Sequence, residues 1–374
     1  MPDMTPRDVI LSALRRQQDE LIPFEFTGFN RCAAARFRQQ TGTSDPYAYF
    51  GCATRLGHIG FQATKLDLRE RFMAFHHLDP GLRYDSGPEP GPQTFYLNEF
   101  GTAHLPGSDD AYDEYTPPAA MRQADSLEAF EKYPMPDYEA SYRHAHLAEQ
   151  AARIKSGNLA VVGHMEMTIF ERAWQIRGLE ELMMDFYDHP DFAACLLDRI
   201  TAGSVFCARR YAQAGADLLR TGDDVAMQDR LLMSPEVWRK FLKPRLAKVF
   251  QAAKAVNPDI LICYHSDGNI TDLVEDLIEI GMDVLNPVQP ECVDVPALKQ
   301  RFGRRLSFWG TIGLQRALPF GTPADVEAEV RQRIEQAGAG GGLLLSPTHV
   351  LAPEVPLENM AAMFRAALQY GQRK

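Results

Sequence analysis

The sequence contains no apolar run that approaches the roughly 20 residues needed to span a membrane. It also lacks CxxC spacing, because its six cysteines are scattered along the chain. The opening segment, MPDMTPRDVILSALRRQQ, has no apolar core of the kind found in a secretion signal and is typical of a short amphipathic helix capped by Thr5. These absences predict a cytoplasmic protein with reduced thiols and no membrane partner.

Basic residues are also fewer than acidic residues. The chain has 39 Lys and Arg residues against 50 Asp and Glu residues, so its formal charge is −11. This charge repels nucleic-acid phosphates and anionic lipid headgroups, and we expect neither as a partner. With 374 residues and 45% hydrophobic content, the chain can bury a large core. Composition leaves the oligomeric state open, a homodimer included.

Two regions of the chain differ in residue composition and in hydrophobic pattern. Residues 1–145 are rich in turn-forming and aromatic residues, with loop-like stretches over 79–92 and 105–118. Between these stretches, TFYLNEFGTAHL alternates around Gly101 as a β-hairpin does. The mixture predicts a decorated region whose residues 79–118 form a mobile cover over a site.

Residues 158–370 are regular, because short apolar runs alternate there with amphipathic helical stretches. Runs that are apolar throughout are typical of parallel strands covered on both faces. Ser234 and Pro235 indicate one helix start, with Asn257 and Pro258 at its end, and Thr322 indicates another start. The six runs are NLAVVGHMEM, ADLLRTGDD, DILICYHSDG, DVLNPVQPE, LSFWGTIG and GGLLLSPTHV.

Such a series predicts either a barrel or an open doubly wound sheet. No GxGxxG turn follows a strand, and the GAGGG run at 338–342 precedes its strand, as a helix-to-strand turn does. We therefore predict one α/β domain over residues 1–374, a (β/α)₈ TIM barrel with N-terminal helical, loop and hairpin insertions. IPFEFTGF near residue 22 and FQATKLD near residue 61 would supply its first two strands.

Catalytic groups of a barrel lie where strands pass into loops at the carboxyl end, so polar residues that close the apolar runs are the candidates. Each has a simpler interpretation as a rim hydrogen bond, a helix cap or a surface charge. The predicted catalytic residues are His164, Glu166, Asp223 and Asp224. The predicted substrate-binding residues are Gln228, Tyr264, Gln289 and Glu291.

A metal site is also predicted. His265 and Asp267 are two residues apart, so both face the same side if the strand extends that far. With His349 from another strand end, they would give zinc three ligands and leave one position open.

Several blocks together carry a family resemblance. TGDDVAMQDRLLMSPEVWRKFLKPRLAKVFQAAK, YHSDGNI, DVLNPVQPE, FWGTIGLQRALPFGT and SPTHVLAPEVPLENMAAM resemble, in order, successive blocks of the uroporphyrinogen decarboxylase superfamily. The superfamily contains porphyrinogen decarboxylases, which use no cofactor, and zinc-dependent methyltransferases that work with corrinoid proteins or thiols. The resemblance implies an enzyme with one of these two activities.

The methyltransferase branch is the better match. The arginine-rich RQAGRYLPE motif of true decarboxylases is absent, and FTGFNRCAAARFRQQTG stands in its place. The zinc-ligand pattern of the methyltransferases, His-x-Cys followed by a distant Cys, has its counterpart at His265, with Asp267 and His349 in place of the cysteines. Without thiolates, a bound zinc would be a stronger Lewis acid, suited to the ether oxygen of a methoxylated substrate.

The resemblance thus implies a zinc-dependent methyltransferase or demethylase that acts on a small molecule, with a corrinoid on a partner protein or a thiol or folate acceptor. One alternative is a metal-independent carboxy-lyase acting on a carboxylated ring, with Asp223 or Asp224 as proton donor. Another is an inactive barrel that serves as a binding subunit. The residues do not identify the substrate.

Overall fold

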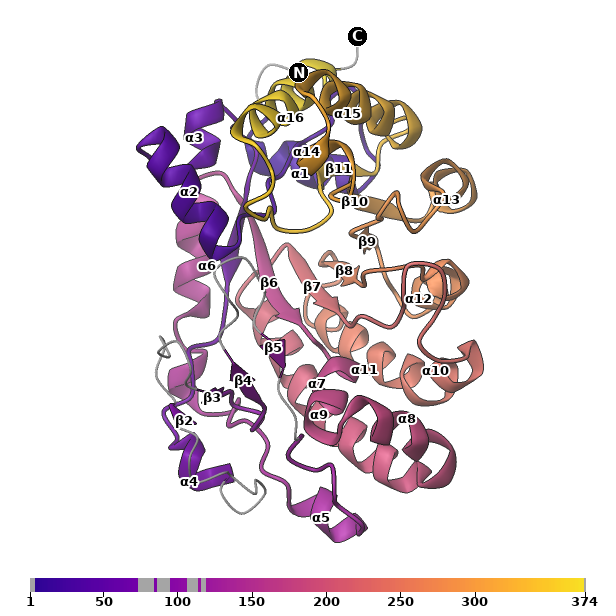
Figure 1. Ribbon diagram of the computed structural model, residues 1–374. Helices are drawn as coiled ribbons and strands as arrows, with labels where there is room; N and C mark the ends of the chain where they lie inside the picture. The colour runs from indigo at the N-terminus through magenta and orange to yellow at the C-terminus, as the bar shows by residue number, and fades with distance from the viewer. Residues whose placement is uncertain (1–3, 73–83, 86–94, 106–113, 116–118, 373–374) are drawn as a thin grey trace.

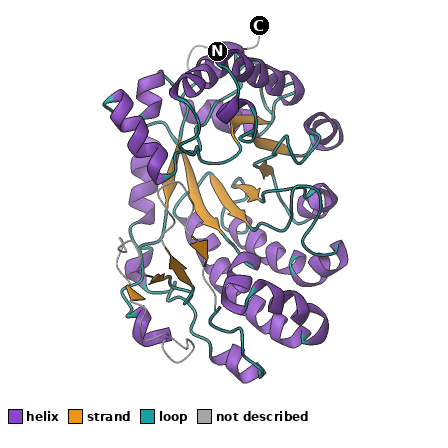
Figure 2. Cartoon of the chain, in the orientation of Figure 1, coloured by secondary structure: helices purple, strands orange, loops and turns teal. Residues whose placement is uncertain are grey.

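The computed structural model describes residues 4–72, 84–85, 95–105, 114–115 and 119–372. Seven parallel strands form one sheet, and helices surround it in the ribbon (Figures 1 and 2). The order is β1 (Leu56–Ile59), β6 (Ala160–Glu166), β7 (Leu218–Gly222), β8 (Leu261–His265), β9 (Val284–Asn286), β10 (Ser307–Ile312) and β11 (Leu343–Pro347). The strands from β6 to β11 lie in the six predicted apolar runs, which confirms those predictions.

The helices begin largely where the sequence indicates. Thr5 and Thr322 form capping boxes, and the Ser234 side chain accepts a hydrogen bond from Val237 N. The helices are α1 (Pro6–Leu14), α2 (Arg31–Thr41), α3 (Pro46–Phe50), α4 (Leu68–Phe72), α5 (Leu127–Lys132), α6 (Leu147–Ser156), α7 (Phe170–Arg177), α8 (Leu179–Asp188), α9 (Pro190–Gln213), α10 (Pro235–Phe241), α11 (Lys243–Lys254), α12 (Val274–Glu279), α13 (Val295–Phe302), α14 (Ala317–Phe320), α15 (Pro323–Ala337) and α16 (Leu357–Tyr370).

One predicted helix was wrong in its extent. The stretch from Ser234 to Asn257 is divided at Leu242 into α10 and α11, because Pro244 at the start of α11 has no N–H to continue the first helix. No helix within the described ranges is long and apolar enough to cross a membrane. None of the six cysteines, all of which are described, forms a disulfide.

The sheet is curled, and its inner face is apolar toward the amino ends of the strands. One buried cluster takes residues from all seven strands, among them Val162 of β6, Cys263 of β8 and Leu344 of β11. The intervening residues, such as Val161 and Ile262, belong to the core beneath the helices. Helix α1 contacts β6 and β11 and adds three apolar side chains to the inner cluster, which are Ile10, Leu11 and Leu14.

The first predicted strand, IPFEFTGF near residue 22, is not formed as a strand. The segment near residue 22 lies beside β11, where Glu25 N donates to Leu345 O at 2.9 Å and Leu345 N donates to Pro23 O at 3.0 Å. These bonds make a parallel bridge between Phe24 and Leu345 rather than a ladder. The segment thus occupies the place next to β11 that an eighth strand would take.

The second predicted strand, FQATKLD near residue 61, was wrong. Residues 61–67 are irregular, and β1 at Leu56–Ile59 comes just before them. In β1 only Leu56, Gly57 and Ile59 are buried, whereas His58 is exposed. A four-residue strand with Gly and His at its centre gives little apolar signal, and this explains the misplacement.

The predicted hairpin around Gly101 is confirmed. Strands β3 (Phe95–Leu97) and β4 (Ala103–Leu105) are antiparallel, and β2 (Tyr84–Asp85) and β5 (Glu114–Tyr115) complete a small four-stranded sheet. Gly101 has φ +73°, a left-handed conformation that favours glycine. Most of the cover predicted for residues 79–118 lies outside the described residues.

Candidate metal and substrate site

The inward-facing rows of the sheet change from apolar to polar toward the carboxyl ends of the strands. Because side chains alternate along a strand, the residues two beyond the inner apolar ones face the same interior. This rule places polar side chains from several strands above the apolar cluster, and some of them contact one another. Among them are His164, Glu166, Arg220, His265 and Asn286.

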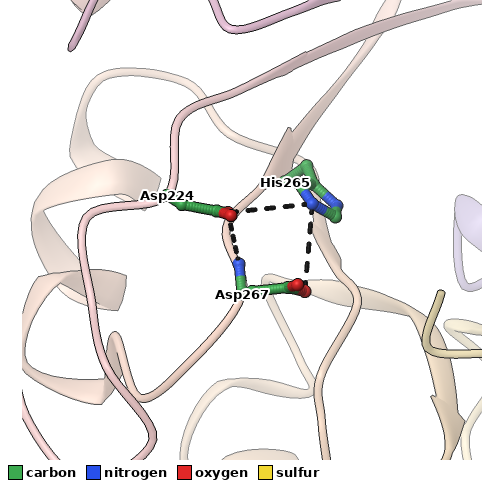
Figure 3. Close-up of side chains that lie close together, drawn as sticks. All are labelled: Asp224, His265 and Asp267. Atoms are coloured by element: carbon green, nitrogen blue, oxygen red, sulfur yellow. Dashed lines mark hydrogen bonds and ion pairs between the residues drawn. The ribbon is translucent and has the colours of Figure 1, made fainter. Parts of the chain in front are cut away.

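Three residues form a group that could hold a metal ion (Figure 3). His265 ends β8, Asp267 follows two residues later, and Asp224 follows β7. One ligand atom from each lies within 4.8 Å of the other two. His265 Nε2 is 3.8 Å from Asp224 Oδ1 and 3.9 Å from Asp267 Oδ1. Asp267 N donates to Asp224 Oδ1 at 2.8 Å and so fixes that carboxylate.

These residues fit a divalent cation. The two imidazole-to-carboxylate distances are too long for hydrogen bonds. Asp267 Oδ1 is buried and accepts no hydrogen bond from the described residues, and such an atom is costly without a partner. Burial and the charge of Asp224 raise the pKa of Asp267, while His265 and His349 oppose the shift. One imidazole and two carboxylates suit zinc and other first-row divalent metals.

Asn286 determines which nitrogen of His265 faces this group. Asn286 Nδ2 donates to Trp309 O at 3.0 Å, so its Oδ1 must be the atom that faces His265 Nδ1 at 2.6 Å and Arg220 Nη2 at 3.2 Å. A carbonyl oxygen only accepts, and Nδ1 therefore carries the hydrogen. In the neutral imidazole the lone pair is then on Nε2, which faces the two aspartates.

Glu166 connects the metal-binding group to His164, the other inward-facing polar residue of β6. Its carboxylate lies 3.0 Å from His164 Nε2, 2.5 Å from Arg220 Nε and 3.8 Å from His265 Nδ1. Burial alone would raise the pKa of Glu166, but the hydrogen bond with His164 and the charge of Arg220 hold it well below its usual range. Gly222 allows this close assembly, because a Cβ there would lie 2.3 Å from His265 O.

Asp223, predicted to be catalytic, faces the opposite side of β7. Its carboxylate accepts hydrogen bonds from Ile169 N and Glu171 N at the start of α7, so the structure gives it the capping contacts of the simpler interpretation. Tyr264 faces that side as well, since it is fully buried near Phe250 and its hydroxyl donates to Asp223 O at 3.3 Å. The predicted catalytic and substrate-binding roles of the two residues remain predictions without support from this placement.

The other predicted residues lie around the rim. His349 is close enough to lower the pKa of Asp267 but does not belong to the compact group of three. Gln289 Oε1 accepts from Gly268 N at 2.7 Å and so fixes the loop after Asp267. Glu291 Oε1 accepts from Gln315 N, and Gln228 donates to the Gln315 side chain.

Sequence reasoning missed Arg220, Asn286 and Glu171. Arg220 and Asn286 lie within apolar runs, where the strand parity of His265 would have identified them as inward-facing residues. Glu171 Oε2 accepts from Asp224 N at 3.1 Å. Burial, Asp223 and Asp224 together raise the pKa of Glu171. No motif marks this glutamate, because it comes from the first turn of α7.

A cavity of about 750 Å³ opens beside Glu166 and His164. Both its size and its mixture of aromatic and charged walls are typical of a small-molecule site. The aromatic residues and thioethers among its described lining residues are Phe61, Phe100, Tyr138, Tyr211, Met165 and Met167.

Comparison with known proteins identifies the family. The family model described as uroporphyrinogen decarboxylase matches residues 102–370, which is more than half of the chain. The chain belongs to the uroporphyrinogen decarboxylase family. Over nearly its whole length it has the fold of a methyltransferase from Methanosarcina mazei, with a TM-score of 0.69, 19% identity and coverage of 98% of this chain and 99% of that chain.

Curated relatives include both branches of the family. A methylcobamide:CoM methyltransferase, MtaA, from Methanosarcina barkeri is 30% identical over 213 residues, which cover 57% of this chain and 59% of the relative. A uroporphyrinogen decarboxylase from Nostoc punctiforme is 25% identical and covers 48% of each chain. The chain therefore spans about three fifths or less of the length of these relatives, and the methyltransferase is the more similar of the two.

Proposed function

We propose that this family member is a metal-dependent methyltransferase that removes a methyl group from a small methylated molecule, with a corrinoid protein or a thiol or folate as the acceptor. The observation that carries the proposal is the group Asp224, His265 and Asp267, with its buried unsatisfied oxygen. The similarity to a methylcobamide:CoM methyltransferase supports the reaction type. We assign zinc as the metal, with His349 near the site as a further candidate ligand.

A divalent metal held by these residues would supply Lewis acidity toward the oxygen or sulfur atom of a bound substrate. The residues of the chain prepare the site for it. Asn286 keeps a hydrogen on His265 Nδ1, and the backbone N–H of Asp267 orients Asp224. Arg220 balances the negative charge of Glu166, so this carboxylate stays ionised beside the metal-binding group.

The carboxy-lyase alternative is less well supported. It would use Asp223 or Asp224 as a proton donor, yet Asp223 is fully buried and its carboxylate is bound by backbone N–H groups of α7. Asp224 faces His265 and Asp267, as a ligand would. The arginines of the N-terminal segment, Arg31, Arg36 and Arg38, are exposed on α2, where Arg36 donates to Pro353 O.

Elemental analysis tests the proposal directly. We expect the purified protein to contain zinc or another divalent metal, and His265→Ala and Asp267→Ala each to lose it, since a site with few ligands seldom survives the loss of one. His189→Ala is the matched control, because His189 is exposed at the end of α8 and does not belong to the metal-binding group. Metal content and methyl transfer from methoxylated compounds to free cob(I)alamin should fall together in the two ligand variants.

Two results would overturn the proposal. The first is a wild-type protein that contains no metal and still transfers methyl groups. The second is carbon dioxide release from a carboxylated tetrapyrrole that is equally fast in wild type and His265→Ala, which would favour the carboxy-lyase.

A further inference from the structure

The cavity beside Glu166 has an apolar, ring-lined wall. Phe61 meets Tyr211 edge to face, with ring centroids 5.3 Å apart, and Phe61 and Tyr138 are 5.8 Å apart in the same arrangement. Met165 and Met167 add thioether surface from the end of β6. Such walls favour a flat aromatic molecule, because ring edges and sulfur atoms pack well against a π-face.

Among the described residues that line the cavity, the charged side chains are paired, with one exception. Arg143 is paired with Glu99 and Asp137, and Glu166 is paired with Arg220 and His164. Arg172 also lines the cavity, and among the described residues it forms no ion pair with a carboxylate.

The Arg172 guanidinium is held in place by uncharged neighbours. It lies 4.7 Å from the Phe100 ring centroid, and its Nη1 donates to Gln175 Oε1 at 3.1 Å. A guanidinium has five N–H donors, so most of them remain available, in the planar fork that matches a carboxylate.

From this arrangement we infer that the cavity binds an arene carboxylate, with the ring against Phe61 and Tyr211 and the carboxylate on Arg172. This inference deepens the proposed function and rests on it for one point, namely that the methylated group lies at the Glu166 end. Glu166 lines the cavity and its carboxylate is 3.8 Å from His265 Nδ1, so the cavity adjoins the residues that support the metal-binding group. Arg172 is then the residue that determines substrate specificity.

Binding, rather than turnover, tests this inference. Calorimetric titration of the purified wild-type protein with 4-methoxybenzoate should give a Kd at least about tenfold lower than with methoxybenzene, which has no carboxylate, or with 4-methoxycyclohexanecarboxylate, which has no aromatic ring. In Arg172→Gln the Kd for 4-methoxybenzoate should rise about tenfold to a hundredfold. Arg172→Lys keeps the charge without the fork and should lie between the two.

The controls separate this inference from the proposed function. Arg209→Gln changes an exposed arginine of α9 outside the cavity and should bind as wild type does. His265→Ala should lose metal but keep its affinity for 4-methoxybenzoate, so a metal-free protein does not invalidate the binding test. Equal affinity of wild type for 4-methoxybenzoate and methoxybenzene would overturn the inference, as would unchanged binding in a folded Arg172→Gln.

Discussion

The amino and carboxyl ends of the strands in the seven-stranded sheet differ in the side chains that they place in the interior. At the amino ends the interior is filled with apolar side chains and closed by α1, whereas at the carboxyl ends it contains an imidazole, carboxylates, a guanidinium and an amide. The change from apolar to polar occurs between one inward-facing residue and the next along a strand, for example from Cys263 to His265 on β8. The apolar layer at the amino ends, here called the lower layer, stabilises the fold by burying apolar surface. The polar layer at the carboxyl ends, here called the upper layer, costs free energy of desolvation, which the lower layer must offset.

If this division is right, the largest stability loss will come from the lower layer. Leu14 is fully buried between α1 and the strands. Leu14→Ala should lower the free energy of unfolding by about 2 to 5 kcal/mol, measured by urea denaturation. Its metal content at low temperature should match that of wild type. Leu66→Ala, at a 40% exposed position, is the control and should cost less than about 0.5 kcal/mol. Metal loss in a folded Leu14→Ala protein would show that the two layers are not separate.

Glu25 provides a second test of how buried polar groups affect stability, because it is a carboxyl group buried beside β11. Burial raises its pKa to about 7, although the Tyr47 hydroxyl and the Arg220 charge favour ionisation. A carboxyl group whose pKa is higher in the folded state stabilises the fold fully below its ordinary pKa of 4.5 and loses that contribution as pH rises through about 7.

Stability should therefore fall by up to about 3 kcal/mol between pH 4.5 and pH 7 because of Glu25. Glu25→Gln resembles the protonated form and should remove this part of the pH dependence in urea titrations. A Gln variant whose stability changes with pH as steeply as that of wild type would show that Glu25 is not the cause.

The last prediction concerns Asn286, in the upper layer, and the quantity it measures is metal affinity rather than stability. Asn286→Leu removes the acceptor that fixes the His265 tautomer and should weaken metal binding about 10-fold to 100-fold, measured by competition with a chromophoric chelator. Asn286→Asp keeps the acceptor toward His265 Nδ1 but loses the donor to Trp309 O, so its metal affinity should fall less than that of Asn286→Leu. Nitrogen NMR of the His265 ring checks the cause, because the Nδ1–H form should dominate in wild type but not in Asn286→Leu.

The sequence predicted the regular half of the fold because strands covered on both faces are apolar throughout and are separated by capped helices. It did not predict β1, which has His and Gly at its centre. It did predict a strand around Glu25, but that segment forms only isolated bridge contacts with β11, across more than 300 residues. Such long-range pairing leaves no local periodicity.

The candidate site was predicted in part for a related reason. Residues that close a strand were easy to identify, and His265, Asp267 and Asp224 do lie together. Strand parity predicted the common side of His265 and Asp267, but Asp223 and Tyr264 have the opposite parity and face away from that side. Arg220 and Asn286 were missed because they lie within apolar runs. A polar residue there can be identified as a site residue only when the inward-facing positions of the strand are known.

The position of α1 has a consequence for kinetics. Since this helix closes the amino end of the interior, a small molecule and any second reactant reach the metal-binding group from the same, carboxyl side. Under the proposed function, donor and acceptor would share one entrance and could not pass each other freely. Double-reciprocal plots at several acceptor concentrations would then show mutual inhibition at high levels of either reactant, a pattern imposed by a helix at the opposite end of the strands.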